Sequence, residues 1–168
     1  ELRLVAAPIV VNGWLFTIDS EHQVTALNAE SGKQIWRIDL TPKAEDDGHI
    51  GGGITFEAGR IFVATGFGVV YALNAKDGAV LWSTPVDGPM RTAPTAHGGQ
   101  VFVMTLENKT IAFDSKTGKK QWTHAGTTET ASVLGGGSPA VDQGVVVVGY
   151  SSGEVFALKS ESGRVLWS

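Results

Sequence analysis

The stretch from Ala72 to Trp82 reads ALNAKDGAVLW, and its pattern occurs four times along the chain. In each copy an Ala stands ten residues before a Trp, and glycines stand four and twenty-three residues before it. The four sets are Gly13, Ala26, Gly32 and Trp36; Gly59, Ala72, Gly78 and Trp82; Gly99, Ala112, Gly118 and Trp122; Gly144, Ala157, Gly163 and Trp167. A register fixed over this length indicates repeated copies of one structural unit, arranged as a propeller or an array.

The second copy shows what the unit is. Short β-rich runs at 54–57, 60–65, 69–74 and 79–84 are separated by turns that contain glycine. Such spacing predicts an antiparallel meander. The run 69–74 is apolar on both faces, so a sheet must cover each side of it. Radially stacked four-stranded blades meet this demand.

We therefore predict an all-β fold, a β-propeller of four-stranded antiparallel blades. The chain is one domain over residues 1–168, with repeats at about 2–40, 50–86, 92–125 and 138–168. The tryptophans that keep the register are expected to pack between blades rather than to stack a quinone: Trp36, Trp82, Trp122 and Trp167. Trp14 lies outside the register and is expected in the second strand of the first blade.

Composition excludes several classes of function. The chain has 168 residues, 42% hydrophobic residues, 22 glycines and a net charge of −4. This charge argues against non-specific nucleic-acid binding, which needs a basic surface. No run of 18 apolar residues occurs, so no helical membrane span is predicted. The absence of Cys excludes disulfides and thiolate metal sites.

The run from Ala112 to Trp122, AFDSKTGKKQW, resembles the repeat A-x-D-x-x-T-G-x-x-x-W of the pyrroloquinoline-quinone (PQQ)-type β-propellers. Within that superfamily the chain is most similar to the BamB family, the periplasmic lipoprotein subunit of the outer-membrane β-barrel assembly machine. Shared features are the style of the repeat and the entries Ala7-Pro8, Ala93-Pro94 and Ser138-Pro139. Family members are eight-bladed, so the resemblance implies about the N-terminal half of such a ring.

The resemblance also implies a function. It implies a non-enzymatic scaffold that binds the periplasmic POTRA domains of the central subunit, BamA, and unfolded outer-membrane protein segments. It implies a periplasmic location, at the inner leaflet of the outer membrane, through a lipid anchor that these residues do not contain. The family's partner loop maps onto Ser132, Val133, Leu134 and Gly135, without the Arg of the family, and Arg91 is a second candidate.

No catalytic, cofactor-binding or metal-binding residue is predicted. His22, His49, His97 and His124 are not spaced as zinc ligands, and we expect solvated loop histidines. Asp46-Asp47-Gly48 lacks the alternating oxygens of a calcium loop. Gly66-Phe67-Gly68 is not followed by a helix that could bind phosphate. The runs Gly51–Gly53 and Gly135–Gly137 are expected to be flexible connectors.

Two alternatives to the scaffold stay open. The first is part of a PQQ-dependent dehydrogenase, although no calcium site or Cys pair is recognisable. The second is a repeat domain whose role is self-assembly, because four blades of a larger ring leave apolar flanks uncovered.

Overall fold

Sixteen strands form four antiparallel sheets in the computed structural model, which describes residues 6–42, 51–90, 92–127 and 137–168. The strands are β1 (Ile9–Val11), β2 (Trp14–Ile18), β3 (Gln23–Asn28), β4 (Gln34–Asp39), β5 (Gly52–Glu57), β6 (Arg60–Thr65), β7 (Val69–Asn74), β8 (Val80–Pro85), β9 (Thr95–His97), β10 (Gln100–Met104), β11 (Lys109–Asp114), β12 (Lys120–Ala125), β13 (Ala140–Asp142), β14 (Val145–Gly149), β15 (Val155–Lys159) and β16 (Val165–Trp167). The fold class predicted from the sequence is confirmed. The described residues contain no helix able to span a membrane.

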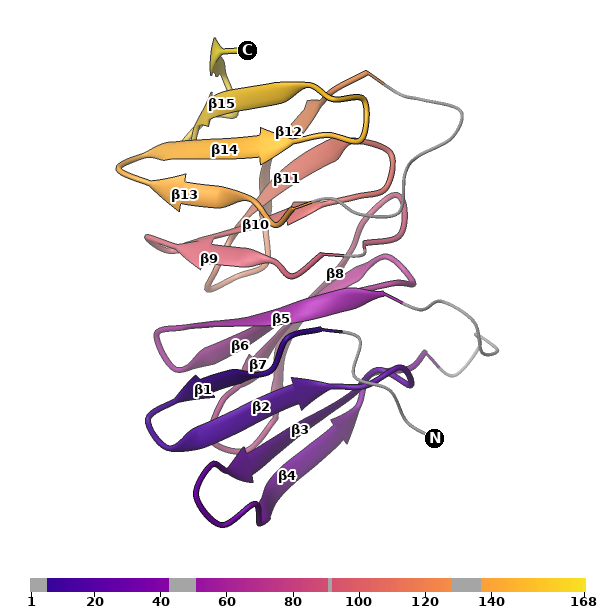
Figure 1. Cartoon of the computed structure of the whole chain (residues 1–168), viewed down its shortest axis with the longest axis vertical. Helices are drawn as coiled ribbons and strands as arrows, with labels where there is room; N and C mark the ends of the chain where they lie inside the picture. Colours follow the sequence, from indigo (N-terminus) through magenta and orange to yellow (C-terminus); the bar gives the residue numbers. More distant parts are fainter. Residues whose placement is uncertain (1–5, 43–50, 91, 128–136) are drawn as a thin grey trace.

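Each sheet is one blade, and its strands follow chain order from the first to the fourth. Figure 1 shows the blades stacked one upon the next, from β1–β4 at the indigo end to β13–β16 at the yellow end. The first strands of neighbouring blades lie together: β1 against β5, β5 against β9 and β9 against β13. The hydrophobic core is accordingly divided into layers between blades. One layer joins Phe16 and Val24 of blade 1 to Ile61 and Leu73 of blade 2.

The recurrent alanine and tryptophan are cross-strand partners. Ala72 on β7 pairs with Trp82 on β8, and the register shifts directly after Ala72. The other blades repeat this pairing at Ala26 and Trp36, Ala112 and Trp122, and Ala157 and Trp167. Side chains directly opposite each other share one face of a sheet. The small alanine therefore leaves room for the indole ring on the side that faces the next blade.

Three tryptophans lock their blade to the next one. The indole Nε1 of Trp36 donates a hydrogen bond to the carbonyl of Ala75 at 2.9 Å, and Trp82 and Trp122 donate to Ser115 and Ser160 at 3.0 and 2.7 Å. Each ring also covers a turn glycine of the next blade. A Cβ on Gly118 would lie 2.6 Å from the Trp82 ring, so only glycine allows this approach. We call this contact the indole–glycine interlock.

Trp167 does not follow the prediction for the register tryptophans. It is 54% exposed, whereas Trp36 is 8% exposed. The physical reason is that, among the described residues, no blade lies beyond blade 4 and no turn glycine covers the Trp167 ring.

Two glycines of the predicted flexible run are also different from expectation. Gly52 and Gly53 are buried and belong to β5. A Cβ on Gly52 would lie 2.1 Å from the Ala64 carbonyl oxygen, and one on Gly53 would lie 2.5 Å from the Ala93 Cα. These glycines therefore serve close packing of the first strands, not flexibility.

We predict that Trp82→Ala lowers the free energy of unfolding by about 3–5 kcal/mol, because it removes a buried aromatic side chain and its hydrogen bond. The matched control is Leu81→Ala on the same strand, whose side chain is 47% exposed. Leu81→Ala should change the free energy of unfolding by no more than about 0.5 kcal/mol. Urea unfolding followed by circular dichroism measures both. Equal shifts for the two variants would show that the interlock does not stabilise the stack.

Candidate protein-binding site

The structure separates two rims of the blade stack. The turns at Gly13, Gly32 and their repeats lie on one rim, which we call the turn rim. The other rim, the connection rim, carries the second turn of each blade and the chain's passage from one blade to the next. The predicted partner residues Ser132, Val133, Leu134, Gly135 and Arg91 lie outside the described residues, as do His49 and Asp46-Asp47-Gly48.

A polar network fixes the described residues that lead toward Ser132. Thr127 donates to the Glu154 carboxylate from its backbone N–H at 2.8 Å and from its hydroxyl at 2.9 Å. Asn108 donates to the Thr127 carbonyl at 2.8 Å, and its own side-chain oxygen accepts from the backbone and hydroxyl of Ser151. These bonds tie blade 3 to blade 4 on the connection rim. Thr127, the last described residue before Ser132, is therefore held in place by both blades.

The Glu154 carboxylate is matched to this role. Hydrogen bonds from Ser152 and Thr127 lower the pKa of Glu154 below its ordinary value. The carboxylate is thus ionised at neutral pH, where it accepts the strongest hydrogen bonds.

An aromatic cluster lies behind the network. The Tyr150 hydroxyl is 2.8 Å from the Thr110 hydroxyl and 2.9 Å from Nδ1 of His124. The rings of His124 and Tyr150 are stacked, with centroids 6.0 Å apart. Burial lowers the pKa of His124 and raises the pKa of Tyr150. Both groups are therefore held in their neutral forms.

The prediction of solvated loop histidines is wrong for His22 and His124, whereas His97 is exposed to solvent as predicted, although it lies at the end of a strand. His22 is buried, although it lies in the turn between β2 and β3, and its ring meets the edge of Phe67 at 4.7 Å between centroids. His22 has a left-handed backbone, with a φ of +55°. His97 ends strand β9 and is exposed, and His124 lies in β12 and is half-buried. The described residues contain no group of three His, Asp or Glu side chains that could hold a metal ion.

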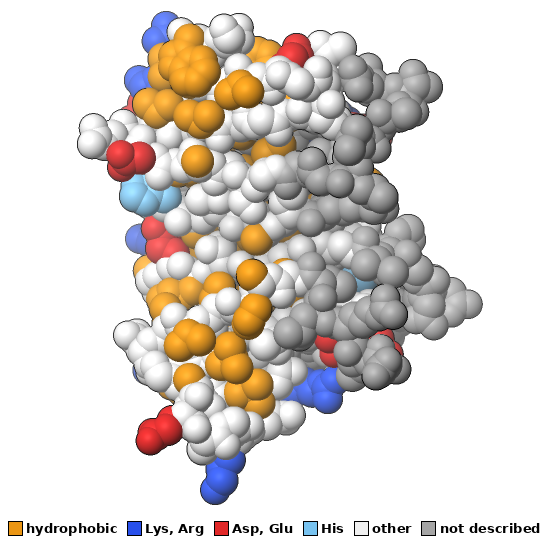
Figure 2. All heavy atoms as spheres, in the orientation of Figure 1, with side chains coloured by type: hydrophobic (Ala, Val, Ile, Leu, Met, Phe, Trp, Pro, Cys, Tyr) orange, Lys and Arg blue, Asp and Glu red, His pale blue; other side chains and the backbone are white. Residues whose placement is uncertain are grey.

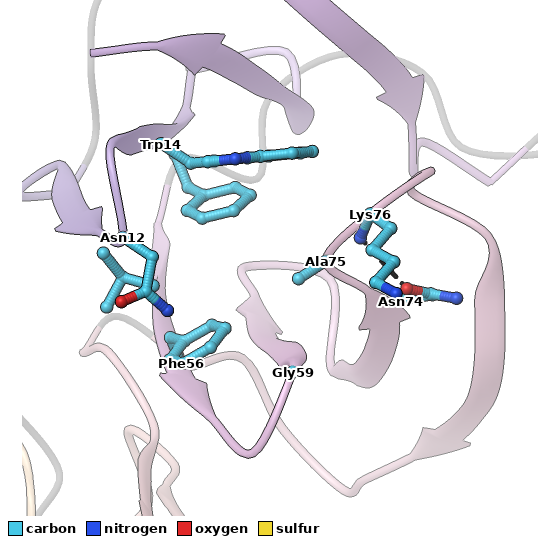
Figure 3. Close-up of a pocket in the computed structure, with 9 residues that line it drawn as sticks. Asn12, Trp14, Phe56, Gly59, Asn74, Ala75 and Lys76 are labelled. Carbon is cyan, nitrogen blue, oxygen red and sulfur yellow. Dashed lines mark hydrogen bonds between the residues drawn. The ribbon is translucent and has the colours of Figure 1, made fainter.

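A pocket of about 250 Å³ opens on the turn rim between blades 1 and 2. Trp14 and Phe56 form its walls (Figure 3), and Phe16 also lines it. The Trp14 and Phe16 rings stack at 6.0 Å between centroids, and Phe16 and Phe56 stack at 6.5 Å. Figure 2 shows hydrophobic side chains gathered at the lower left, over the ends of blades 1 and 2 that carry these turns. The pocket thus presents half-exposed aromatic surface at a rim.

Polar groups border this aromatic pocket. Asn12 belongs to the turn between β1 and β2, Asn74 is the last residue of β7, and Lys76 lies in the turn between β7 and β8. The Asn74 side chain accepts a hydrogen bond from the Lys76 backbone N–H at 3.0 Å, which fixes the turn (Figure 3). The charged group among the lining residues is the Lys76 ammonium. A partner segment that carries an apolar side chain beside a carboxylate would match this combination of an aromatic pocket and an ammonium group.

The aromatic walls are particular to blades 1 and 2. At the interface of blades 2 and 3, Arg60 stands at the repeat position of Trp14, and Ala96 stands at the repeat position of Phe56. The third interface has Gln100 at the Trp14 position, and its amide donates to the Ser160 carbonyl at 3.0 Å. The pocket therefore arises where the sequence departs from its own repeat. The sequence held this signal in Trp14, the one tryptophan outside the register, but Phe56 and Lys76 were not recognised as candidates.

The fold and its repeat define a class of protein, the PQQ-type β-propellers. A family model described as outer membrane protein assembly factor BamB matches residues 5–47 and 20–168, and the chain belongs to that family. BamB of Yersinia pestis is 34% identical over 158 residues, covering 91% of this chain and 40% of the Yersinia protein. The chain thus spans about two fifths of the length of the curated relatives it matches.

Solved structures agree with this assignment at the level of the fold. BamB of Moraxella catarrhalis superposes with a TM-score of 0.83 and 23% identity, covering 99% of this chain and 51% of that chain. A quinohemoprotein alcohol dehydrogenase from Comamonas testosteroni superposes with a TM-score of 0.77 and 20% identity, covering 98% of this chain and 34% of that chain. At these identities, both likenesses show a shared fold.

We predict a pH dependence that His124 carries. Because burial lowers the pKa of His124 from its ordinary 6.5, folding favours the neutral ring. The neutral ring therefore stabilises the fold at a pH above the ordinary pKa of histidine, and this stabilisation is lost as the pH falls below that pKa. The thermal midpoint should therefore drop between about pH 7 and about pH 5, and His124→Gln should reduce the drop. His97→Gln, at an exposed position, is the matched control and should leave the drop unchanged; an equal effect of both changes would refute the role of His124.

Proposed function

We propose that this chain is part of a non-enzymatic scaffold in outer-membrane β-barrel protein assembly. It acts in the periplasm, associated with the outer membrane, and binds the POTRA domains of the central subunit, BamA. The observation that carries the proposal is the match of the whole repeat array to the BamB family. The interlocked blades suit this role, because a stack joined by repeated buried contacts holds its rims in fixed relative positions.

The POTRA domains bind on the connection rim, through the loop that contains Val133 and Leu134. The Thr127–Glu154 network supports this assignment because it fixes the start of that segment on the rim. Arg91 is the second residue proposed for this contact, to which it would add a positive charge.

Unfolded outer-membrane protein segments bind at the pocket on the turn rim. A buried aromatic anchor is the usual source of affinity in a protein contact. The pocket of about 250 Å³ is below the range of about 300–1,000 Å³ for drug-sized ligands. It therefore suits one side chain of an extended peptide, aromatic against Trp14 and Phe56, with a carboxylate near Lys76.

The dehydrogenase alternative has less support. The indole faces that a quinone would use are covered by Gly78, Gly118 and Gly163 at the three interlocks. Retention of PQQ and calcium after gel filtration would nevertheless contradict the scaffold proposal.

We predict that the double variant Val133→Ser and Leu134→Ser weakens capture of isolated POTRA domains while the thermal midpoint stays unchanged. The reason is that serine removes the apolar surface that Val133 and Leu134 would bury against the partner. The matched control replaces Val80 and Leu81 with Ser, since these apolar side chains are also adjacent and exposed. Unchanged capture by the loop variant would remove the loop from the proposed contact.

We predict that Trp14→Ala and Lys76→Glu each weaken binding of an extended acidic peptide that carries one Phe, by about tenfold for Trp14→Ala. Fluorescence anisotropy of the labelled peptide measures the affinity. Lys116→Glu is the matched control, because Lys116 occupies the same turn position in blade 3 and is exposed. If Lys116→Glu and Lys76→Glu reduce the affinity equally, the acidic peptide is held by non-specific charge attraction to the chain, and the pocket is not its binding site.

A further inference from the structure

The turns between the first and second strands of the four blades share one geometry. In blade 1, Val11 pairs with Trp14 across Asn12 and Gly13, whose φ values are +51° and +78°. Two positive φ values in a two-residue loop are typical of a type I′ hairpin turn. The equivalent pairs in the other blades are Ala58-Gly59, Gly98-Gly99 and Gln143-Gly144. Asparagine before the glycine therefore distinguishes blade 1 from the other three.

The Asn12-Gly13 pair joins two groups that can react with each other. The asparagine side chain carries an amide carbon, and the backbone nitrogen of the next residue can attack it and close a five-membered ring. Glycine permits this approach most readily, because it has no Cβ that crowds its nitrogen. Asparagine is accordingly among the thermolabile residues of proteins.

The fold leaves both reacting groups free. Asn12 is exposed, and within the described residues neither its side-chain amide nor the Gly13 backbone N–H makes a hydrogen bond. A Cβ on Gly13 would meet no atom within 4 Å. Ala58 and Gly59, in the same turn of blade 2, are equally exposed although blades 1 and 3 lie on either side of them. The exposure of Asn12 therefore follows from the place of this turn on the turn rim.

The other three asparagines of the chain lack this combination. The side-chain oxygens of Asn28 and Asn74 accept backbone N–H groups of their own turns at 2.7 and 3.0 Å. Asn108 is buried and is bonded through both its amide nitrogen and its oxygen. The residues that follow them are Ala29, Ala75 and Lys109, each with a Cβ. Asn12 is thus the asparagine that sequence and structure together leave reactive.

We propose that Asn12 is a site of spontaneous deamidation in the folded chain. The Gly13 backbone nitrogen bonds to Cγ of Asn12, the bond from Cγ to the side-chain nitrogen breaks, and ammonia leaves with the proton of the Gly13 N–H. Water then opens the ring at either of its two carbonyl carbons. One opening leaves aspartate at residue 12, and the other leaves isoaspartate, whose backbone runs through the former side chain. Either product carries one more negative charge than Asn12.

The new charge lies at the aromatic pocket. Asn12 and Lys76 both line this pocket, and Figure 3 shows them on opposite sides of its opening. A peptide carboxylate attracted by Lys76 then faces a second carboxylate across the same opening. Because like charges repel, the modification lowers the affinity of the pocket for acidic segments. This consequence rests on the proposed peptide binding, whereas the modification itself does not.

The test is mass spectrometry of proteolytic fragments after the folded chain has been kept at mildly alkaline pH, with circular dichroism as the check that it stays folded. We expect the fragment that contains residue 12 to convert to the aspartate and isoaspartate forms, while fragments with Asn28, Asn74 and Asn108 keep their amides. Asn12→Gln should abolish the conversion, because the longer side chain must close a six-membered ring. An Asn12 amide that persists as long as the other three would overturn the proposal.

Gln143 and Gly144 provide the matched control. They occupy the same turn in blade 4, with φ values of +44° and +78°, and Gln143 is exposed. We expect Gln143 to keep its amide and Gln143→Asn to create a second site of conversion. An intact asparagine in the Gln143→Asn variant would show that an open turn of this geometry does not permit the reaction, and the structural basis of the proposal would fail.

Asn12→Asp carries the charge of the product from the start. We expect it to weaken binding of the acidic peptide with one Phe by about fivefold, the effect of one exposed charge pair. Gln143→Asp adds the same charge on blade 4 and should leave the affinity unchanged. Equal losses for the two variants would refute the effect of the modification on the pocket. If the unmodified chain binds no such peptide, the proposed peptide binding fails, while conversion at Asn12 still supports the modification site.

Discussion

The stack depends on one steric condition, which is that the turn facing each indole ring has no Cβ. The Trp82 ring lies 2.6 Å from where a Cβ on Gly118 would be, and the Trp36 and Trp122 rings lie 2.7 and 2.6 Å from Cβ positions on Gly78 and Gly163. The indole N–H then reaches a backbone carbonyl that would otherwise be buried without a partner. Each interlock joins shape and hydrogen bonding in one contact, so both residues recur together in the sequence.

Departures from the repeat are where the molecule acquires its individual features. Trp14 and Phe56 replace the polar or smaller residues of the other interfaces, and they open an aromatic pocket on the turn rim. His124 and Tyr150 add a polar layer to the interface of blades 3 and 4, next to the Glu154 and Thr127 contact. The regular positions build the scaffold, and the irregular ones distinguish one interface from the next.

These irregular features lie on opposite rims. The aromatic pocket is at the turn rim, and the network around Asn108 and Glu154 is at the connection rim. A scaffold with two separated surfaces can hold two different protein segments at the same time. This arrangement suits the role proposed for the family, in which one surface binds a stable component of the machine and the other binds a transient one.

The sequence by itself determined the class of fold, because the decisive signals are local. Strands such as 60–65 and 69–74 and the turn before Trp82 follow from alternation and from glycine at fixed places, and the structure has β6 and β7 at those residues. The burial of particular residues was decided only by the tertiary structure, because it depends on whether another blade lies alongside. Trp167 has a local sequence similar to that of Trp82, but no blade within the described residues covers it, and His22 is buried although it lies in a turn. The pocket between Trp14 and Phe56 is likewise tertiary, since its walls come from different blades and meet only when the blades stack.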